Sequence, residues 1–491
     1  MSVYTPPLTV ALLTYNRRHY LQEALDAILR QSYRDFELLV LDNCSTDDTA
    51  QYILSLKDPR IRYVRNAPNN STVTFNCISA YHLAIGRRVI ATHDDDIMED
   101  SMLERQMRFL DENPDTRLVW CRVSDIDQDG TSIPQNVGND ADKIFGIGEY
   151  ITSFLKTRLW PMPSGIMLDK AVLPKGFGIE RYLKPKRTDG NPVDTAGIGD
   201  VLLPARINQK HAVGYIAQPL LRRRIHLNQF THAASLSRPG VPLYRRLERI
   251  ARGIKGGGAP NTLHFRAFID RFDVQEAITT NEAATVSPRT ARRLRALATR
   301  LVENTDIAPD AFLAGLPVFL LGNLIASRDE LRLRSLQNLN ADGYDNATQK
   351  MLHWARRVTN TPDSSILEPL AGKRIVIFGS AFIAALLILE ARRHGHQIAC
   401  CIDSNSTRHG TDLLGTPIRT PDWMRMHVTS DDVIVMSSER DHEHYIAAVI
   451  RQNLLASPHL LSWKDLVELS IDNTPPTACQ LTEPDDAIEL S

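Results

Sequence analysis

Three consecutive aspartates, Asp94, Asp95 and Asp96, follow His93 at the end of an apolar run, residues 89–92, that predicts a β-strand. Adjacent carboxylates repel one another, and a divalent cation, free or bound to phosphate, would offset their charge. In open α/β sheets, ligands bind at the carboxyl ends of the strands, which is where this run lies. The pattern indicates a cation or phosphate site; the alternative is a solvated acidic turn that caps a helix starting near Ser101.

Two further predicted strands also end on polar side chains. The strand predicted at residues 8–14 ends on the run Thr14, Tyr15, Asn16 and Arg17. The strand predicted at residues 36–41 is followed by Asp42. Thr and Asn can bond to a ribose or a base edge, and a carboxylate can accept from a base imide N–H. Asn16 and Asp42 could each be only a helix cap, but the three strand ends together favour a nucleotide-binding rim.

The elements that must position these residues alternate between strand and helix over the first 123 residues. Apolar periodicity predicts strands at 8–14, 36–41, 61–64, 89–92 and 118–123, and helices at 20–30, 75–85 and 101–112. Such alternation predicts an α/β layer with a mostly parallel sheet. Residues 130–240 are rich in Gly, Pro and Asn and are expected to form an active-site wall of loops with a few helices and strands.

The remainder of the chain divides into two further regions and a tail. Glycines 256–258 predict a flexible connection. Residues 262–360 have a helical pattern whose arginines are interpreted as a solvated helix face: Arg292, Arg293, Arg295 and Arg300. A second α/β unit is predicted from Gly372. The predicted domains are therefore 1–240, 241–371 and 372–470, with 471–491 as a disordered tail.

Composition excludes several classes of protein. The chain has 491 residues, with 57 Lys plus Arg against 58 Asp plus Glu, which argues against a protein held to nucleic acid by bulk charge. Six cysteines without a C-x-x-C pair predict neither a zinc nor a disulfide framework. No signal peptide or membrane-spanning stretch is visible, so the expected location is the cytoplasm. Composition leaves open peripheral attachment to the inner membrane through the Arg-rich helices, and homo-oligomerisation.

Residues 8–119 resemble the nucleotide-binding half of family 2 glycosyltransferases, which adopt the GT-A fold. The resemblance rests on the order and spacing of four segments: 10–17 (VALLTYNR), 21–33 (LQEALDAILRQSY), 36–49 (FELLVLDNCSTDDT) and 93–97 (HDDDI). The family usually has a second acid where Asn43 stands, a mild departure because Asn preserves hydrogen bonding. The resemblance implies that the first predicted domain is a GT-A nucleotide-diphospho-sugar transferase domain. The predicted fold class is therefore α/β, with this GT-A domain, a helical middle region that resembles no named family, and a C-terminal α/β domain.

The resemblance also implies roles for the residues at the rim. Thr14, Tyr15, Asn16, Arg17 and Asp42 would bind the nucleotide of a sugar-nucleotide donor. Asp94 and Asp96 would form the DxD pair, one toward the ribose and the other on the metal, with Asp95 as an alternative for either role. The metal would be Mn²⁺ or Mg²⁺ bridging the diphosphate, since a divalent cation stabilises the negative charge that develops on the departing nucleoside diphosphate.

The family's catalytic base is the Asp of a Glu-Asp pair that precedes a helix. Its counterpart here is Asp200, although Gly199 replaces the Glu; Asp189 and Asp194 are alternatives, and a helix cap is the structural alternative. The segment 222–226 (RRRIH) resembles the family's basic segment, which implies Arg224 as a diphosphate clamp and His226 as a metal ligand. Segment 163–165 (PSG) resembles the stretch that shapes the acceptor side, and Trp160 could stack on a sugar or belong to the core.

The C-terminal unit resembles the small Rossmann-like domains attached to bacterial surface-sugar enzymes. Gly379 keeps only the first glycine of a dinucleotide fingerprint, and Ala381 and Ala384 replace the other two. A structural or protein-docking module is therefore favoured over an NAD site, although Asp403 could bond a ribose.

The predicted function is a metal-dependent inverting glycosyltransferase that uses a UDP-, dTDP- or GDP-linked sugar. The acceptor hydroxyl would belong to a surface polysaccharide, a lipid-linked glycan or a protein. The alternatives are a sugar-nucleotide-binding protein with lost or regulatory activity, and an NAD-dependent sugar-modifying enzyme that uses the C-terminal domain.

Overall fold

The structure is a computed structural model that divides into two compact units, Met1–Phe265 and Arg266–Ser491. The described residues are 4–67, 73–133, 141–157, 159–173, 199–226, 240–254, 261–279, 286–303, 309–325, 336, 339–404, 408–439, 443–452 and 454–472.

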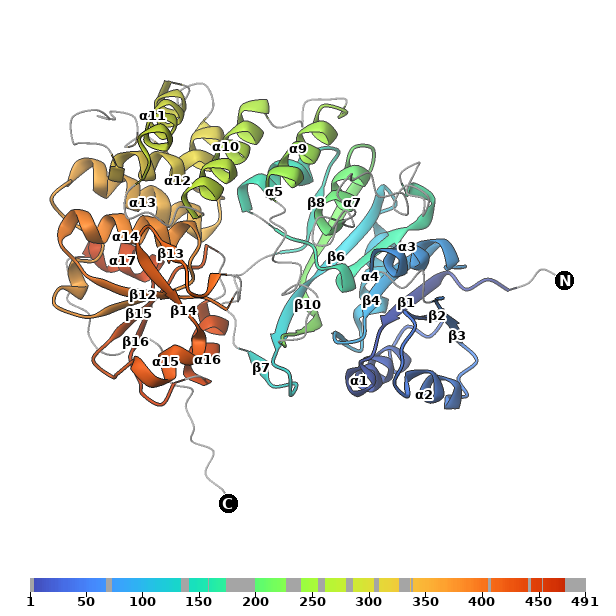
Figure 1. The fold of residues 1–491 in the computed structure, drawn as a ribbon. Helices are drawn as coiled ribbons and strands as arrows, with labels where there is room; N and C mark the ends of the chain where they lie inside the picture. The colour runs from blue at the N-terminus through green and yellow to red at the C-terminus, as the bar shows by residue number, and fades with distance from the viewer. Residues whose placement is uncertain are drawn as a thin grey trace, which may run out of the picture. The chain divides into compact units, whose positions relative to one another are not determined.

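The first unit is built on a ten-stranded sheet in the order β3-β2-β1-β4-β9-β6-β10-β5, with β7 added to β6 and β8 to β10 (Figure 1). Strands β1, β2, β3 and β4 are mutually parallel where they pair, and β9 runs antiparallel to both β4 and β6. The strands are β1 (Leu8–Thr14), β2 (Phe36–Asp42), β3 (Ile61–Arg65), β4 (Arg88–His93), β5 (Ile97–Met98), β6 (Thr116–Ile126), β7 (Ser132–Ile133), β8 (Lys143–Phe145), β9 (Ile166–Asp169) and β10 (Ala212–Arg224).

The helices of this unit cover the sheet on both faces. They are α1 (Arg18–Leu29), α2 (Thr49–Ser55), α3 (Val73–Leu83), α4 (Met102–Glu112), α5 (Glu149–Thr157), α7 (Gly199–Asn208) and α9 (Gly240–Ala251). Helix α9 precedes the predicted connection, whose glycines 256–258 lie outside the described residues.

Strands β1 and β2 are buried along their whole length because both faces of the sheet are covered. Alternate side chains serve two cores. Leu12 and Val40 pack in one core with Leu25 of α1, whereas Leu13 and Leu41 pack in the other, which also contains Ala80 of α3. A continuous apolar run, such as residues 8–13, is the sequence signature of this arrangement.

The second unit contains helices that share a core with one face of a second sheet. The helices before the sheet are α10 (Thr262–Thr279, which contains the boundary between the units), α11 (Pro288–Glu303), α12 (Pro309–Ile325) and α13 (Asn346–Asn360). The arginines of α11 with described side chains are exposed, and Arg293 and Arg300 pair with Asp273 and Asp270 of α10, which agrees with a solvated helix face.

The second sheet has six strands in the order β13-β14-β12-β11-β15-β16, all parallel where they pair except β13 with β14 (Figure 1). Its elements are β11 (Ile375–Phe378), α14 (Phe382–His394), β12 (Ile398–Ile402), β13 (Asp412–Leu413), β14 (Thr416–Arg419), α15 (Pro421–His427), β15 (Val433–Met436), α16 (Glu443–Gln452), β16 (His459–Ser462) and α17 (Trp463–Asp472).

The predicted α/β class is confirmed, with a parallel-rich sheet in the first unit and a second sheet toward the C-terminus. The predicted boundaries at 240/241 and 371/372 stay a prediction, and residues 473–491 of the predicted tail lie outside the described residues. In the part of the chain that the structure describes, no helix is both long and apolar enough to cross a bilayer.

One glycine controls how closely the start of β4 can approach β1. Gly86 donates its backbone N–H to Oγ1 of Thr9 at 2.9 Å. A Cβ at Gly86 would lie 2.5 Å from two backbone atoms, the carbonyl carbon of Leu8 and the nitrogen of Thr9. No side-chain rotation can relieve such a clash, because both atoms belong to a central strand.

We expect Gly86→Ala to lower the free energy of unfolding by about 1–3 kcal/mol, the usual cost of an overpacked interior. Urea denaturation, followed by circular dichroism, measures the free energy of unfolding. The matched control is Gly146→Ala, because its Cβ would first meet the flexible end of the Glu149 side chain, at 3.2 Å. The control should change stability by no more than about 0.5 kcal/mol; equal losses in both variants would contradict the proposed clash.

Candidate active site

The polar residues predicted to act together lie at the carboxyl edge of the first sheet. Leu13 of β1 pairs with His93 of β4, so Thr14 and Asp94 leave their strands side by side. Three residues beyond Asp94, β5 begins, and its Ile97 pairs with Arg222 of β10. The acidic segment, Asp94–Asp96, is therefore held between β4 and β5, next to the end of β10.

Asp94 is bound by the loop that follows β1. Its Oδ2 accepts from the Thr14 hydroxyl at 2.8 Å and from the Tyr15 backbone N–H at 3.2 Å. Its Oδ1 lies 3.4 Å from Nη1 of Arg17. Thr14, Tyr15 and Arg17 were predicted to bind a nucleotide; here they hold the first aspartate of the acidic segment.

Asp95 lies between two basic side chains. Its Oδ2 is 2.7 Å from Nη1 of Arg17 and 3.1 Å from Nε2 of His226. His226 is buried, and its Nδ1 has no hydrogen-bond partner among the described residues. The structure thus brings His226 to the acidic segment, where its contact is Asp95. Its predicted role as a metal ligand stays a prediction.

Asp96 is held by Ser164, a contact that the sequence did not predict. The buried Ser164 hydroxyl donates to Oδ2 of Asp96 at 2.6 Å, and its oxygen lies 3.0 Å from Nδ1 of His93. The backbone N–H of Arg224 reaches Oδ1 of Asp96 at 3.3 Å. The segment 163–165 was assigned to the acceptor side, and no local signal in the sequence connects Ser164 with residue 96.

The three carboxyl groups differ in how readily they ionise. Burial, together with the charge of Asp95, raises the pKa of both Asp94 and Asp96 to about 6. Burial also opposes ionisation of Asp95, but the hydrogen bond with His226 and the charges of His93 and Arg17 outweigh it and hold the pKa of Asp95 below its usual value. The segment therefore resists carrying three negative charges by itself.

The donor set fits the predicted cation by its chemistry. Carboxylate oxygens suit Mg²⁺ and Mn²⁺, and His226 offers an unpaired ring nitrogen. Among the described residues no three acidic, His or Cys side chains already converge as a finished metal centre. Arg17 binds Asp95 and Ser164 binds Asp96, so these contacts engage carboxylates that a cation would need.

Asp42 and Asn16 shape the loops beside the acidic segment. Asp42 is fully buried, and its carboxylate accepts from the Ser45 backbone N–H at 2.8 Å and from the Tyr63 hydroxyl at 2.7 Å. Asn16 has a positive φ of 49°, and its side-chain oxygen accepts from the Thr46 N–H at 2.7 Å. Both residues lie at the rim, where they link the loops after β1 and β2. Their predicted contacts with a nucleotide stay predictions.

Asp200, the predicted base, lies in the first turn of α7 and is partly exposed. Burial raises the pKa of its carboxyl to about 6, although the charge of His93 and a hydrogen bond with Trp160 act in the opposite direction. The charge that acts on Asp200 belongs to His93, the residue before Asp94. The alternatives Asp189 and Asp194 lie outside the described residues.

Arg224 contributes its backbone to the acidic segment, and its guanidinium has other contacts. That group donates to the carbonyls of Gln128 at 3.0 Å and Asp127 at 3.3 Å, forms an ion pair with Glu23, and lies 4.9 Å over the Tyr20 ring. A phosphate-clamping role for Arg224 stays a prediction, and in this structure the guanidinium fixes the end of β10.

The adjacent Arg223 fixes β10 to β6. Its Nε and Nη2 bind the two carboxylate oxygens of Asp125, each at 2.8 Å, and the Asp125 side chain is only 2% exposed. This bidentate pair stands beside the strand end that delivers Arg224 and His226.

We expect Arg223→Gln to lower the free energy of unfolding by about 3 kcal/mol, because it leaves a buried carboxylate without its partner. Adding Asp125→Asn to the same chain should restore most of that loss. Arg222→Gln is the control, since its partner Glu99 is 42% exposed and such pairs contribute at most about 1 kcal/mol. Chemical denaturation of the wild-type protein and the three variants measures the free energy of unfolding. Equal losses in the Arg222 and Arg223 variants would contradict a stabilising role for the buried pair.

The family comparison agrees with this geometry. Residues 9–167 match the model of Glycosyl transferase family 2. The match includes strands β1, β2 and β4 and the whole acidic segment, and it confirms the resemblance predicted from the sequence.

Curated relatives match over parts of their length. The putative colanic acid biosynthesis glycosyl transferase WcaA of Escherichia coli K12 is 33% identical over 93 residues, which are 18% of this chain and 33% of WcaA. The putative teichuronic acid biosynthesis glycosyltransferase TuaG of Bacillus subtilis 168 is 29% identical over 135 residues, which are 27% of this chain and 53% of TuaG. The chain thus spans about a third to a half of these relatives.

Solved structures align with most of the chain at low scores. S. aureus TarS 1-349 in complex with UDP aligns at a TM-score of 0.40 and 15% identity, over 71% of this chain and 91% of that one. The mannosyltransferase PcManGT of Pyrobaculum calidifontis, in complex with GDP-Man and Mn²⁺, aligns at 0.34 and 17% identity, over 74% and 89%.

Proposed function

We propose that the first unit is a metal-dependent inverting glycosyltransferase that moves a sugar from a UDP-, dTDP- or GDP-linked donor to an acceptor hydroxyl. The observation that carries the proposal is the convergence of Thr14, Arg17, Ser164 and His226 on residues 94–96, which lie within the segment that matches the family 2 model. The acceptor would be a surface polysaccharide, a lipid-linked glycan or a protein. Location in the cytoplasm or at the inner membrane surface and homo-oligomerisation also stay predictions.

Each residue of the site has a role in the proposed reaction. Asp94, Asp96 and His226 would hold Mn²⁺ or Mg²⁺, whose charge would stabilise the departing diphosphate. Arg17 now neutralises Asp94 and Asp95, and we expect it to turn toward the donor phosphates when a cation takes over that task. Thr14, Asn16 and Asp42 would hold the nucleoside. Asp200 would accept the proton of the attacking hydroxyl, because a carboxyl with a pKa of about 6 is still ionised near neutral pH.

Nucleotide binding tests the donor site. In calorimetric titrations with UDP, dTDP, GDP and CDP, we expect one nucleotide to bind only when Mn²⁺ is present. Asp96→Ala should weaken that binding by about 100-fold or more, since it removes a charged ligand. Asp100→Ala is the control, because Asp100 pairs with Arg30 at an exposed position. Binding without metal that is indifferent to Asp96 would overturn the donor-site proposal.

The pH dependence of turnover tests the base. Since Asp200 must be ionised to take a proton, kcat/KM should rise with pH up to about 6 and then level off. Asp200→Asn should lower kcat by roughly 10²–10⁴ and remove that limb of the profile. Asp129→Asn, at an exposed turn, is the control. No turnover by the wild-type protein with any donor that binds would instead favour the alternative of a sugar-nucleotide-binding protein.

A further inference from the structure

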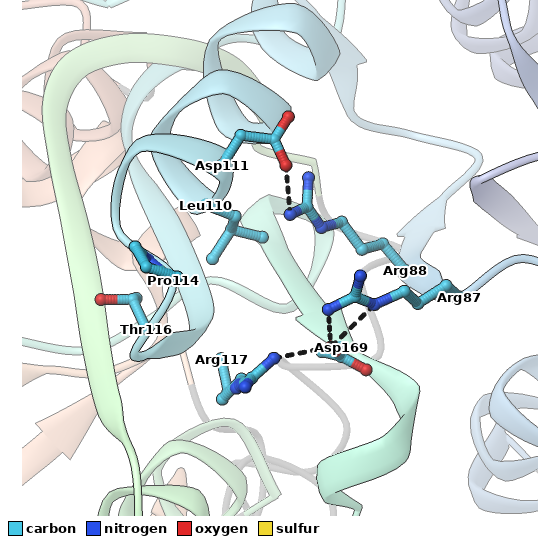
Figure 2. Close-up of a pocket in the computed structure, with 8 residues that line it drawn as sticks. All are labelled: Arg87, Arg88, Leu110, Asp111, Pro114, Thr116, Arg117 and Asp169. Carbon is cyan, nitrogen blue, oxygen red and sulfur yellow. Dashed lines mark hydrogen bonds and ion pairs between the residues drawn. The ribbon is translucent and has the colours of Figure 1, made fainter.

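A second polar pocket lies at the opposite edge of the first sheet, where β4 and β6 begin and the antiparallel β9 ends (Figure 2). Its volume is about 230 Å³. Strand β4 runs from Arg88, in this pocket, to His93, beside the acidic segment. At about 3.3 Å per residue the two sites are therefore roughly 17 Å apart along that strand, so this pocket is a separate site.

Arginine side chains dominate the lining of this pocket. Arg87 and Arg117 both reach the buried carboxylate of Asp169, as Figure 2 shows. Oδ2 of Asp169 accepts from Nε and Nη2 of Arg87, at 3.1 and 3.0 Å, and from Nη1 of Arg117 at 3.2 Å. One carboxylate oxygen thus serves two guanidinium groups, and the Arg87 side chain is 65% exposed.

The lining carries an excess of positive charge. Arg88, the third arginine, pairs with Asp111 at 2.6 Å, so three guanidinium groups face two carboxylates. A guanidinium has five N–H donors. Hydrogen bonds to other described residues use two donors of Arg87 and one of Arg117, so both groups have donors to offer a ligand.

The neighbouring His211 ring indicates a positive field at this pocket. Burial lowers the pKa of the His211 ring, and the charges of Arg117 and Lys210 lower it further, against the opposing charge of Asp169. A positive field suits an oxyanion.

We propose that the pocket formed by Arg87, Arg117 and Asp169 binds a phosphate group. Two guanidinium groups on a rigid sheet edge present paired N–H donors, the geometry that phosphate oxygens accept. The pocket is larger than one phosphate needs, so the phosphate would belong to a soluble phosphorylated compound or to a phospholipid headgroup. This proposal does not depend on the proposed transferase activity.

Titration of the full chain with inorganic phosphate, in a buffer that contains only chloride, tests the proposal. We expect saturable binding that becomes weaker by about tenfold in Arg87→Gln and by more in Arg87→Gln/Arg117→Gln. Arg30→Gln is the control, since Arg30 is also an exposed arginine in an ion pair but directly follows α1 and pairs with Asp100. Thermal unfolding in phosphate-free buffer checks the fold of each variant, and Arg87→Gln, with its exposed side chain, provides the test if the double variant unfolds.

Cosedimentation with vesicles separates the two sources of the phosphate group. Vesicles of phosphatidylcholine with and without phosphatidylglycerol are the probes. Binding to phosphatidylglycerol that is lost in Arg87→Gln assigns a headgroup, whereas binding of inorganic phosphate alone assigns a soluble compound. Phosphate binding that is unchanged in Arg87→Gln and in the double variant, or absent in the wild-type protein, overturns the proposal.

Discussion

The burial of three adjacent carboxylates is the constraint on which the candidate active site depends. A buried charge is costly unless hydrogen bonds and opposite charges replace the lost water. Here the hydrogen-bond donors come from three separate parts of the chain: the end of β1, the turn before β9 and the end of β10. Even so, the pKa values of Asp94 and Asp96 stay raised, which shows that the compensation is incomplete. A site whose buried carboxylates are only partly neutralised by the protein is suited to a cation.

The topology of the sheet makes this convergence possible. Because β1 and β4 are parallel neighbours in register, Thr14 meets Asp94 without any long side chain. Because β9 is antiparallel, its first residues lie at the carboxyl edge of β4 and its last residues at the opposite edge. The same short strand therefore brings Ser164 to the acidic segment and Asp169 to the arginine pocket. One reversal of strand direction contributes to both sites.

At the carboxyl edge of the second sheet, the residues of the first turn bond to one another. Gly379 has a positive φ of 106°, and a Cβ there would lie 2.4 Å from Oγ of Ser437, so the turn after β11 requires glycine for its own geometry. The Ser380 hydroxyl donates to Asp403, the residue that could have bonded a ribose, and Arg408 donates to the Ser380 carbonyl. The single glycine left from a dinucleotide fingerprint is thus explained by packing, which fits the structural or docking module favoured from the sequence.

The amino-acid sequence by itself determined the α/β class, the main strands of the first sheet and the resemblance to family 2 glycosyltransferases, because buried parallel strands read as apolar runs and the polar residues of the rim follow them directly. It also singled out Asp94–Asp96, Thr14 and His226, which the structure brings together; their roles toward a donor or a metal stay predictions. Only the tertiary structure decided their partners. Ser164 and Asp96 are 68 residues apart, and His226 and Asp95 are 131 apart. Such contacts depend on strand order and register, which local periodicity does not encode. For the same reason the arginine pocket had no sequence signal: Arg87, Arg117 and Asp169 are unremarkable until three strand ends meet at one edge of the sheet.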